Sequence, residues 1–229
     1  MHRTYLPRRG GFLLERMVIF ANGKLPDENA ARSLLREGDL LIAADGGARH
    51  LLTMGILPEV VIGDLDSLDE EDLTDLVAAG VEVKQYPEDK DETDLELALE
   101  YALEKAPASI LIIAALGGRL DQTVANLMLL TNPMLAGVDI RLDDGIEEVF
   151  FCRGQVEVLG TEGDMVSLIP WGVPVEGVTT RGLRWSLRDE TLFPERSRGV
   201  SNRMNTDRAA ITIRSGLLLV VHRRDGVRQ

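Results

Sequence analysis

Short apolar runs alternate with amphipathic stretches from residue 17 to about residue 130. The runs predict buried strands at 17–21, 40–44, 60–63, 81–85 and 109–115, and the stretches between them predict helices at 28–37, 48–54, 70–79 and 121–130. Another helix is expected after Thr93, where apolar residues recur at helical spacing from Leu95 to Leu103. Strands that alternate with helices through short connections indicate an α/β fold, with a Rossmann-like, mostly parallel sheet and flanking helices. Ligands of such sheets bind at the carboxyl ends of the strands.

The pattern of apolar and polar residues changes beyond about residue 142. Short β-rich runs at 148–152, 155–159, 165–170, 209–214 and 217–222 are separated by glycine, proline or charged turns, and helical periodicity disappears. This pattern predicts a small all-β sandwich domain, joined to the first part through residues 135–146. We therefore divide the chain into a flexible extension at 1–16, an α/β domain at 17–142 and a β-sandwich domain at 143–229.

Composition narrows the class of protein. The net charge of −13 disfavours a nucleic-acid partner, because proteins that bind nucleic acids present basic surfaces. Cys152 is the single cysteine, which excludes an intrachain disulfide and makes the cytoplasm the default location. His2, His50 and His222 lack metal-ligand spacing and are interpreted as incidental surface residues. No apolar run reaches the roughly 20 residues of a membrane span, so no membrane association is expected.

Paired acids follow the predicted strand at 60–63. Asp64 and Asp66 are two positions apart, a spacing that places both side chains on one face of an extended segment. Like charges at a strand end repel unless a cation lies between them, and Mg²⁺ favours carboxylate oxygens together with substrate phosphates. The alternative is a loop of solvated acids.

Three further polar clusters fall at predicted strand ends. Asp45-Gly46-Gly47 suits close approach of the backbone to a phosphate, although such a glycine pair is also an ordinary turn. In the cluster 90–94, Asp94 is a candidate third carboxylate and Lys90 a candidate phosphate neighbour, while Thr93 reads as a helix cap. In the cluster 117–122, Arg119 can reach phosphate oxygens, and Asp121 either binds substrate or caps the helix.

These motifs, in this order, resemble the thiamine pyrophosphokinase family. The resemblance rests on segments 45–48, 63–67, 90–94 and 117–122, and it extends to segments 182–187 and 198–202 of the β region. It implies transfer of the pyrophosphoryl group of ATP to the hydroxyl of thiamine, with thiamine diphosphate and AMP as products. It also implies a homodimer with thiamine held between the α/β domain of one subunit and the β domain of the other.

The resemblance assigns roles by position. Asp64, Asp66 and Asp94 are expected to hold Mg²⁺ on the triphosphate, and with Arg119 and Asp121 they form the expected catalytic set. The nucleotide and its phosphates are expected to contact Asp45, Gly46, Gly47, Lys90, Thr93, Gly118, Arg119 and Gln122. Thiamine is expected to stack on Trp185, with polar contacts from Ser201 and Asn202, whereas Trp185 as a plain core aromatic is the alternative.

Two points stay open at the level of the sequence. Arg49 stands where many family members have asparagine, which leaves its nucleotide contact undefined, and either Asp66 or Asp94 is a candidate to accept the proton of the attacking hydroxyl. Two other functions compete with the leading one. The first is a different Mg²⁺-dependent nucleotide transferase or phosphohydrolase on the same scaffold, and the second is a non-catalytic thiamine- or nucleotide-binding module.

Overall fold

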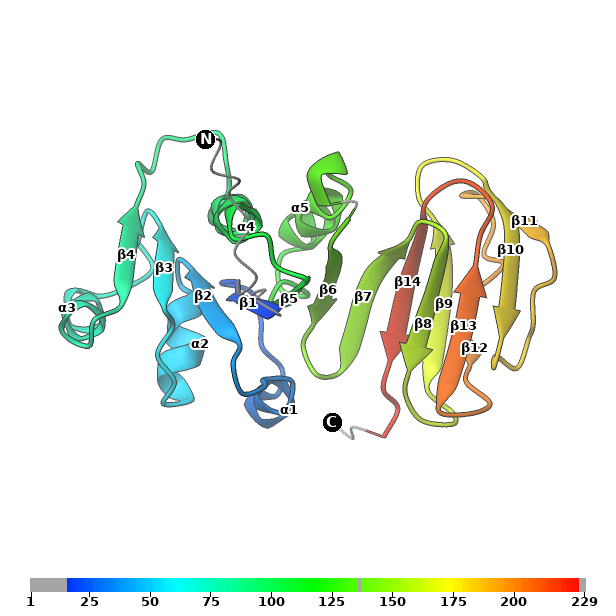
Figure 1. The fold of residues 1–229 in the computed structure, drawn as a ribbon, viewed down its shortest axis with the longest axis horizontal. Coiled ribbons are helices and arrows are strands. Elements are labelled where there is room, and N and C mark those ends of the chain that lie inside the picture. The colour runs from blue at the N-terminus through cyan, green and yellow to red at the C-terminus, as the bar shows by residue number, and fades with distance from the viewer. Residues whose placement is uncertain (1–15, 136, 227–229) are drawn as a thin grey trace, which may run out of the picture.

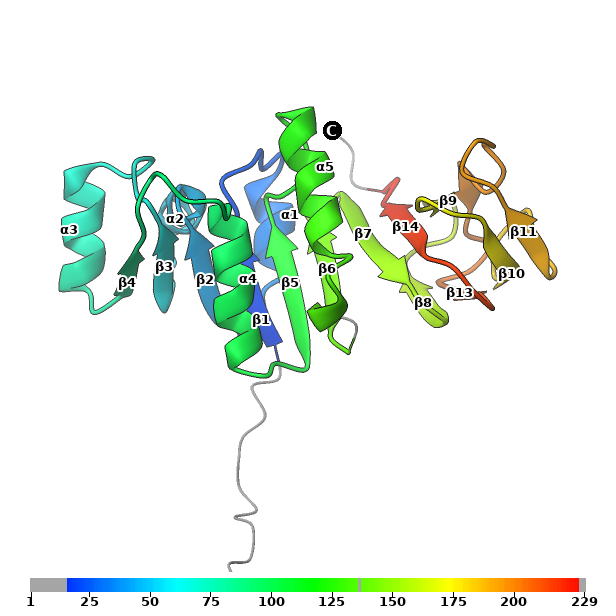
Figure 2. The ribbon, with the colours of Figure 1, turned by 90° about the horizontal axis from the view of Figure 1, so that it is seen from above.

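A single ten-stranded sheet runs through the whole molecule, and a four-stranded sheet packs against one end of it (Figures 1 and 2). The structure is a computed structural model that describes residues 16–135 and 137–226. The strand order of the large sheet is β12-β9-β14-β7-β6-β5-β1-β2-β3-β4, and that of the small sheet is β11-β10-β13-β8. The predicted extension lies outside the described residues except for Arg16, which begins β1.

Six parallel strands form the α/β half of the large sheet. They are β1 (Arg16–Phe20), β2 (Leu40–Ala44), β3 (Val60–Gly63), β4 (Glu82–Gln85), β5 (Ser109–Ile113) and β6 (Asp139–Asp143). Their pairing is parallel throughout, as the alternation of apolar runs and helices predicts. The predicted strands are confirmed, whereas β6 is an additional strand inside the segment interpreted as a join.

Helices cover both faces of this half. The connecting helices are α1 (Glu28–Ser33), α2 (Gly47–Thr53), α3 (Glu70–Ala78), α4 (Asp94–Glu104) and α5 (Leu120–Leu129), followed by a 3-10 turn at Pro133–Leu135. Successive side chains of β1 point to opposite faces: Met17 packs in the cluster with α4 and α5, and Val18 in the cluster with α1, α2 and α3. Figure 1 shows α4 and α5 above the sheet and α1 and α2 below it. Burial on both faces explains why these strands are almost continuously apolar.

Local signals place most of the helix boundaries correctly. Thr93 caps α4 as predicted, because its Oγ1 accepts a hydrogen bond from the Glu96 backbone N–H at 3.2 Å. Helix α1 ends at Ser33 rather than at residue 37, and its C-cap is Leu34.

The β half extends the large sheet with antiparallel strands. β7 (Glu147–Cys152), β14 (Leu218–Arg223), β9 (Met165–Pro170) and β12 (Asn202–Arg203) follow β6 in space. The small sheet contains β8 (Gln155–Leu159), β13 (Arg208–Thr212), β10 (Val175–Arg181) and β11 (Glu190–Leu192). Apolar side chains from both sheets form one core, with Phe150 and Val220 from the large sheet and Ile211 from the small one. The predicted β-sandwich is therefore confirmed.

The two halves share a sheet rather than meeting through a linker. β6 pairs with β7 in antiparallel orientation, with Leu142 opposite Val149, so the predicted boundary at 142/143 falls at a hairpin inside the large sheet. The division into two domains stays a prediction. Within the described residues, the structure has no helix long and apolar enough to cross a membrane.

His222 is fully buried, which contradicts its interpretation as a surface residue. Its Nε2 lies 3.0 Å from Asp164 Oδ2 and its Nδ1 lies 3.4 Å from Glu148 Oε2. Burial alone would lower the pKa of His222, but the two carboxylates raise it above the ordinary value. The imidazole therefore lies buried between two carboxylates that favour its protonated form, where β7, β9 and β14 meet.

Candidate active site

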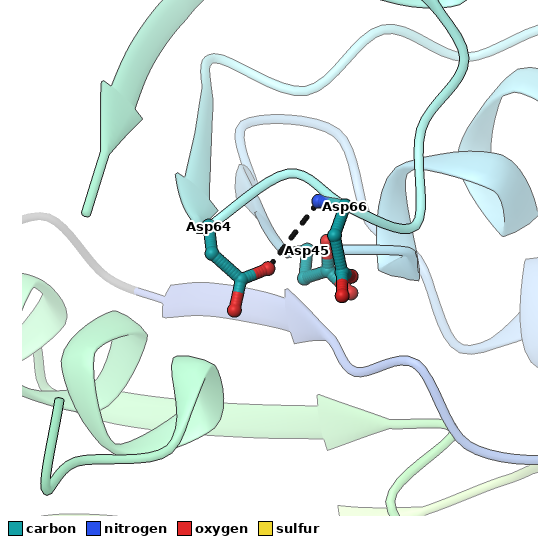
Figure 3. A group of neighbouring side chains, drawn as sticks. All are labelled: Asp45, Asp64 and Asp66. Carbon is teal, nitrogen blue, oxygen red and sulfur yellow. Dashed lines mark hydrogen bonds between the residues drawn. The ribbon is translucent and has the colours of Figure 1, made fainter. Parts of the chain in front are cut away.

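Three carboxylates gather at the carboxyl ends of β2 and β3 (Figure 3). Asp45 follows β2 and is buried, while Asp64 and Asp66 follow β3 and reach the solvent-facing side of the same edge. One carboxylate oxygen from each of the three lies within 4.8 Å of the others. The backbone N–H of Asp66 donates to Asp64 Oδ1 at 3.3 Å. Adjacent parallel strands thus bring together acids that are distant in the sequence.

Gly63 makes room for this cluster. Its φ is +154°, and a Cβ at this position would lie 3.0 Å from Asp45 Cβ and 3.1 Å from the Asp94 carboxylate. Both acids therefore lie against the face of Gly63 on which a side chain would stand. Any residue larger than glycine would push them apart.

Gly47 has a different role from the predicted phosphate contact. A Cβ there would lie 1.9 Å from the Phe20 carbonyl oxygen, so glycine is required for α2 to pack against the end of β1. Gly46 lies against a side chain rather than the backbone, because its Cβ would come 2.3 Å from Asn22 Oδ1. Both glycines therefore have a packing reason, and contact of either with a nucleotide stays a prediction.

Asn22 and Ser67 are site residues that the sequence did not single out. Asn22 Nδ2 donates to Asp45 Oδ2 at 3.2 Å and to Ser67 Oγ at 3.0 Å. The Ser67 hydroxyl in turn donates to Asp66 Oδ1 at 3.2 Å. Asn22 lies just beyond the end of β1, and this strand-end position was the available signal. The two side chains orient the acids of two different loops relative to each other.

Lys90 and Asp94 complete the acidic end of the site. Lys90 Nζ lies 3.2 Å from Asp64 Oδ2 and 3.0 Å from Asp94 Oδ1, and its side chain is only 11% exposed. Asp94 thus lies beside the carboxylate cluster, connected to it through Lys90 rather than grouped with it. Burial raises the pKa of Asp94, an effect that Lys90 only partly offsets. Burial also acts to raise the pKa of Asp64, but the Asp66 N–H and Lys90 lower it overall.

The loop before α5 forms the opposite wall. Arg119 occupies the N-cap position of α5 without a side-chain cap, so the alternative interpretation of Asp121 as the helix cap is wrong. Arg119 Nη2 instead pairs with Asp121 Oδ2 at 2.5 Å, and both side chains are largely exposed. Gly118, Arg119 and Gln122 line the same cavity of about 600 Å³ as Asp45, Asp64, Lys90, Thr93 and Asp94. Most of the predicted nucleotide-site residues are thereby brought around one cavity.

The carboxylates fit a divalent cation. Asp45 Oδ1 is buried and has no hydrogen-bond partner among residues 16–135 and 137–226, which is costly for a carboxylate oxygen unless a ligand satisfies it. Hard oxygen donors from three acids match the preferences of Mg²⁺. The cluster contains the predicted ligands Asp64 and Asp66 and adds Asp45.

A second candidate site lies in the β half. Trp185 is 50% exposed and lines a cavity of about 500 Å³ with Arg196, Ser197, Arg198, Val200 and Asn202. The half-exposed ring disfavours the interpretation of Trp185 as a core aromatic. The Arg184 guanidinium lies 5.2 Å from the centroid of the indole ring. An aromatic face at an open cavity suits a flat cationic ligand.

Asn202 holds Trp185 in place. The Asn202 Nδ2 donates to the Trp185 carbonyl at 2.8 Å, and its Oδ1 accepts from the Trp185 N–H at 3.0 Å. Ser201 adopts a left-handed conformation at φ +58°, and its N–H donates to Ser167 Oγ at 3.0 Å. The Asn202 amide is therefore committed to positioning Trp185, and the Ser201 hydroxyl is exposed beside it.

The two candidate sites are far apart within one chain. Asn202 begins β12, and six strands separate β12 from β2 in the large sheet. At the usual spacing of strands, the separation is on the order of 30 Å. Figure 1 shows β2 and β12 in opposite halves of the molecule. A small ligand bound at Trp185 cannot reach the acids of the same chain.

Comparison with known proteins assigns both halves to one family. The model described as "Thiamin pyrophosphokinase, catalytic domain" matches residues 31–142, and the model described as "Thiamin pyrophosphokinase, vitamin B1 binding domain" matches residues 154–218. The thiamine pyrophosphokinase of Bacillus subtilis (strain 168) is 30% identical over 191 residues, which cover 82% of this chain and 89% of the relative. The chain belongs to the thiamine pyrophosphokinase family. Thiamine pyrophosphokinase 1 of Oryza sativa subsp. japonica is 27% identical over 91% of this chain and 87% of the relative.

Solved thiamine pyrophosphokinase structures share the fold. The structure from Bacillus subtilis has a TM-score of 0.82 at 28% identity, covering 92% of this chain and 100% of that chain. The structure from Geobacillus thermodenitrificans has a TM-score of 0.79 at 27% identity, covering 93% and 99%. The predicted family, fold class and thiamine pyrophosphokinase function are confirmed.

The two family models divide this thiamine pyrophosphokinase along the two candidate sites. The catalytic-domain match contains the acid cluster and the loop before α5, and the vitamin B1 match contains Trp185, Ser201 and Asn202. Asn22 lies outside the catalytic-domain match, although its side chain binds Asp45.

Proposed function

We propose that this thiamine pyrophosphokinase uses ATP as the donor, transferring its pyrophosphoryl group to the hydroxyl of thiamine and releasing AMP. One observation carries the proposal: three aspartates line a cavity of about 600 Å³ with two lysines and an arginine, namely Asp45, Asp64, Asp94, Lys24, Lys90 and Arg119. Asp45 Oδ1 is buried there without a hydrogen-bond partner among the described residues. A triphosphate with its metal needs this combination of acids and cations.

Asp45, Asp64 and Asp66 are the residues that would hold Mg²⁺, with Asp94 beside them. The metal, when bound, neutralises phosphate charge and orients the reacting groups. Asn22 and Ser67 fix the positions of Asp45 and Asp66 relative to each other through their hydrogen bonds.

The chain's own cations complete the phosphate environment. Arg119 is exposed, and its one ion pair within the described part of the chain is with its near neighbour Asp121, so little free energy is lost when its guanidinium turns to phosphate oxygens. Gly118 and Gln122 line the same wall of the cavity. Pyrophosphoryl transfer depends on position and charge stabilisation more than on covalent chemistry, and these groups supply both.

Thiamine is proposed to bind at Trp185. Its flat cationic ring system would stack on the exposed indole face, worth about 0.5–2 kcal/mol. Asn202 acts by fixing the Trp185 backbone, and the exposed Ser201 hydroxyl is available to the ligand.

A homodimer is proposed because one chain cannot join the two sites. A separation on the order of 30 Å requires the acids of one copy to meet Trp185 of a second copy. An apolar stripe lies beside the phosphate cavity, where Leu120, Val124 and Met128 are 77%, 41% and 58% exposed on α5. Such a stripe is a surface that a partner subunit would cover.

The donor is tested by product analysis. The purified protein, incubated with ATP, Mg²⁺ and thiamine, should form AMP and thiamine diphosphate in equal amounts, and nucleotide turnover without thiamine should be negligible. Thiamine-dependent ADP or free phosphate in place of AMP would overturn the proposal.

Cys152 is a buried free thiol, which fits the proposed cytoplasmic location.

A further inference from the structure

Lys90 lies among the acids and contacts Asp64, one of the three carboxylates that would hold a cation. It belongs to the loop between β4 and α4, and its Nζ lies 3.2 Å from Asp64 Oδ2 and 3.0 Å from Asp94 Oδ1. No other cation among residues 16–135 and 137–226 lies within ion-pair distance of Asp45, Asp64, Asp66 or Asp94. One ammonium group thus serves a site with four carboxylates.

The ammonium remains charged in this environment. Carboxylate oxygens of Asp64 and Asp94 lie at ion-pair distance from Lys90 Nζ, and both favour the charged form of the ammonium. The side chain is 11% exposed and makes two ion pairs, which hold it against the acids. Lys90 therefore supplies a positive charge to Asp64 and Asp94 before any ligand binds.

The position of Lys90 also explains why Asp94 stands apart from the other acids. Oxygens of Asp45, Asp64 and Asp66 converge within 4.8 Å, whereas Asp94 Oδ1 faces Lys90. Asp94 is nevertheless close, since a Cβ on Gly63 would touch both Asp45 and Asp94. The ammonium thus contacts one oxygen of Asp64, which belongs to the cluster, and one oxygen of Asp94, which lies outside it.

We propose that Lys90 is a built-in counter-ion that competes with the divalent metal for Asp64 and moves to the phosphates when the nucleotide arrives. This inference rests on the proposed use of ATP and Mg²⁺. The four-carbon stem of lysine allows the movement, because its ammonium is a point charge without fixed directional geometry. The nucleotide then attracts Lys90 away from the acids, so metal and nucleotide bind with positive coupling, which must be reciprocal.

The coupling is measurable without catalysis. Mn²⁺ binding, followed by its paramagnetic resonance signal or by calorimetry, should be weak in the unmodified enzyme and at least about tenfold tighter when an ATP analogue with a methylene bridge between the α- and β-phosphates is present. Equal Mn²⁺ affinity with and without the analogue would overturn the proposal. Because the phosphates of the analogue also bind Mn²⁺, the share of the gain that Lys90 supplies is the difference from the neutral Lys90 variants. The measurement does not depend on turnover.

Substitution at Lys90 supplies the opposite test. Lys90→Gln and Lys90→Met remove the charge, so both should bind Mn²⁺ alone roughly tenfold more tightly, with reduced coupling to the analogue. Lys90→Arg keeps the charge and is the matched control, with affinity near that of the unmodified enzyme. Weaker or unchanged Mn²⁺ binding in the folded neutral variants would show that Lys90 is structural. The AMP assay tests the proposed function separately, through the products that the enzyme forms.

Discussion

Replacing Gly63 with alanine tests whether the acids must converge across β3. The new methyl group would lie 3.0 Å from Asp45 Cβ and 3.1 Å from the Asp94 carboxylate, closer than ordinary contacts allow. Both neighbours are held by their own contacts, Asp45 by Asn22 and Asp94 by Lys90. The methyl group therefore acts as a wedge between two acids.

The expected cost follows from two effects. Overpacking of a tight site typically costs about 1–3 kcal/mol, and a non-glycine residue at φ +154° adds about 1 kcal/mol or more. Displacement of the acids by a few tenths of an ångström up to one ångström should lower kcat/KM for AMP formation by about 10²-fold. The variant is measured by AMP release at several ATP concentrations, together with urea unfolding.

Gly80 provides the matched control. Its φ is +87°, but a Cβ there would meet no atom within 4 Å. Gly80→Ala should therefore lose about 1 kcal/mol of stability through backbone strain and keep its activity. If Gly63→Ala keeps activity within about twofold of the unmodified enzyme, the geometric argument for the acid cluster is refuted.

Three other variants probe the acids, the thiamine site and the buried imidazole. Asp64→Asn should abolish AMP formation with a melting temperature near that of the unmodified enzyme; activity within a few-fold would exclude Asp64 as a metal ligand. Trp185→Ala should raise the KM for thiamine by about 2–30-fold and leave the KM for ATP unchanged, whereas an equal loss for both would make Trp185 structural. Because Glu148 and Asp164 raise the pKa of His222, the stability that His222 contributes is complete below its unfolded pKa of about 6.5 and is lost as pH rises through the folded value. Urea unfolding of His222→Asn should accordingly lack a decline that the unmodified enzyme shows as pH rises above about 6.5; identical pH profiles would contradict the ion-pair account.

The catalytic half of the fold could be predicted because its signals are local. Strands buried on both faces read as continuous apolar runs, and the acids Asp64 and Asp66 follow such a run directly. Thr93 is recognisable as a cap from four consecutive residues. β6 was missed because its apolar positions Ile140 and Leu142 alternate with charged ones in a short segment.

The missed features depend on contacts between distant residues. His222 lies 74 positions from Glu148 and 58 from Asp164, so nothing near it in the sequence signals a buried ion pair. Asn22 joins Asp45 and Ser67 across three separate loops. β6 pairs with β7 and so extends one sheet through both halves. The composition does not signal this pairing, because it changes only beyond residue 142.

A site shared between two copies of the chain is tested most directly by subunit complementation. Asp64→Asn and Trp185→Ala chains, co-expressed with different tags and purified as the mixed dimer, would place intact acids opposite an intact Trp185 at one of the two sites. At low thiamine concentration this dimer should regain about half of the thiamine-dependent AMP formation of the unmodified dimer. A mixed dimer of Asp64→Asn with Asp45→Asn, in which both changes lie in the same half-site, should stay inactive. No recovery in the first mixed dimer would contradict the shared site.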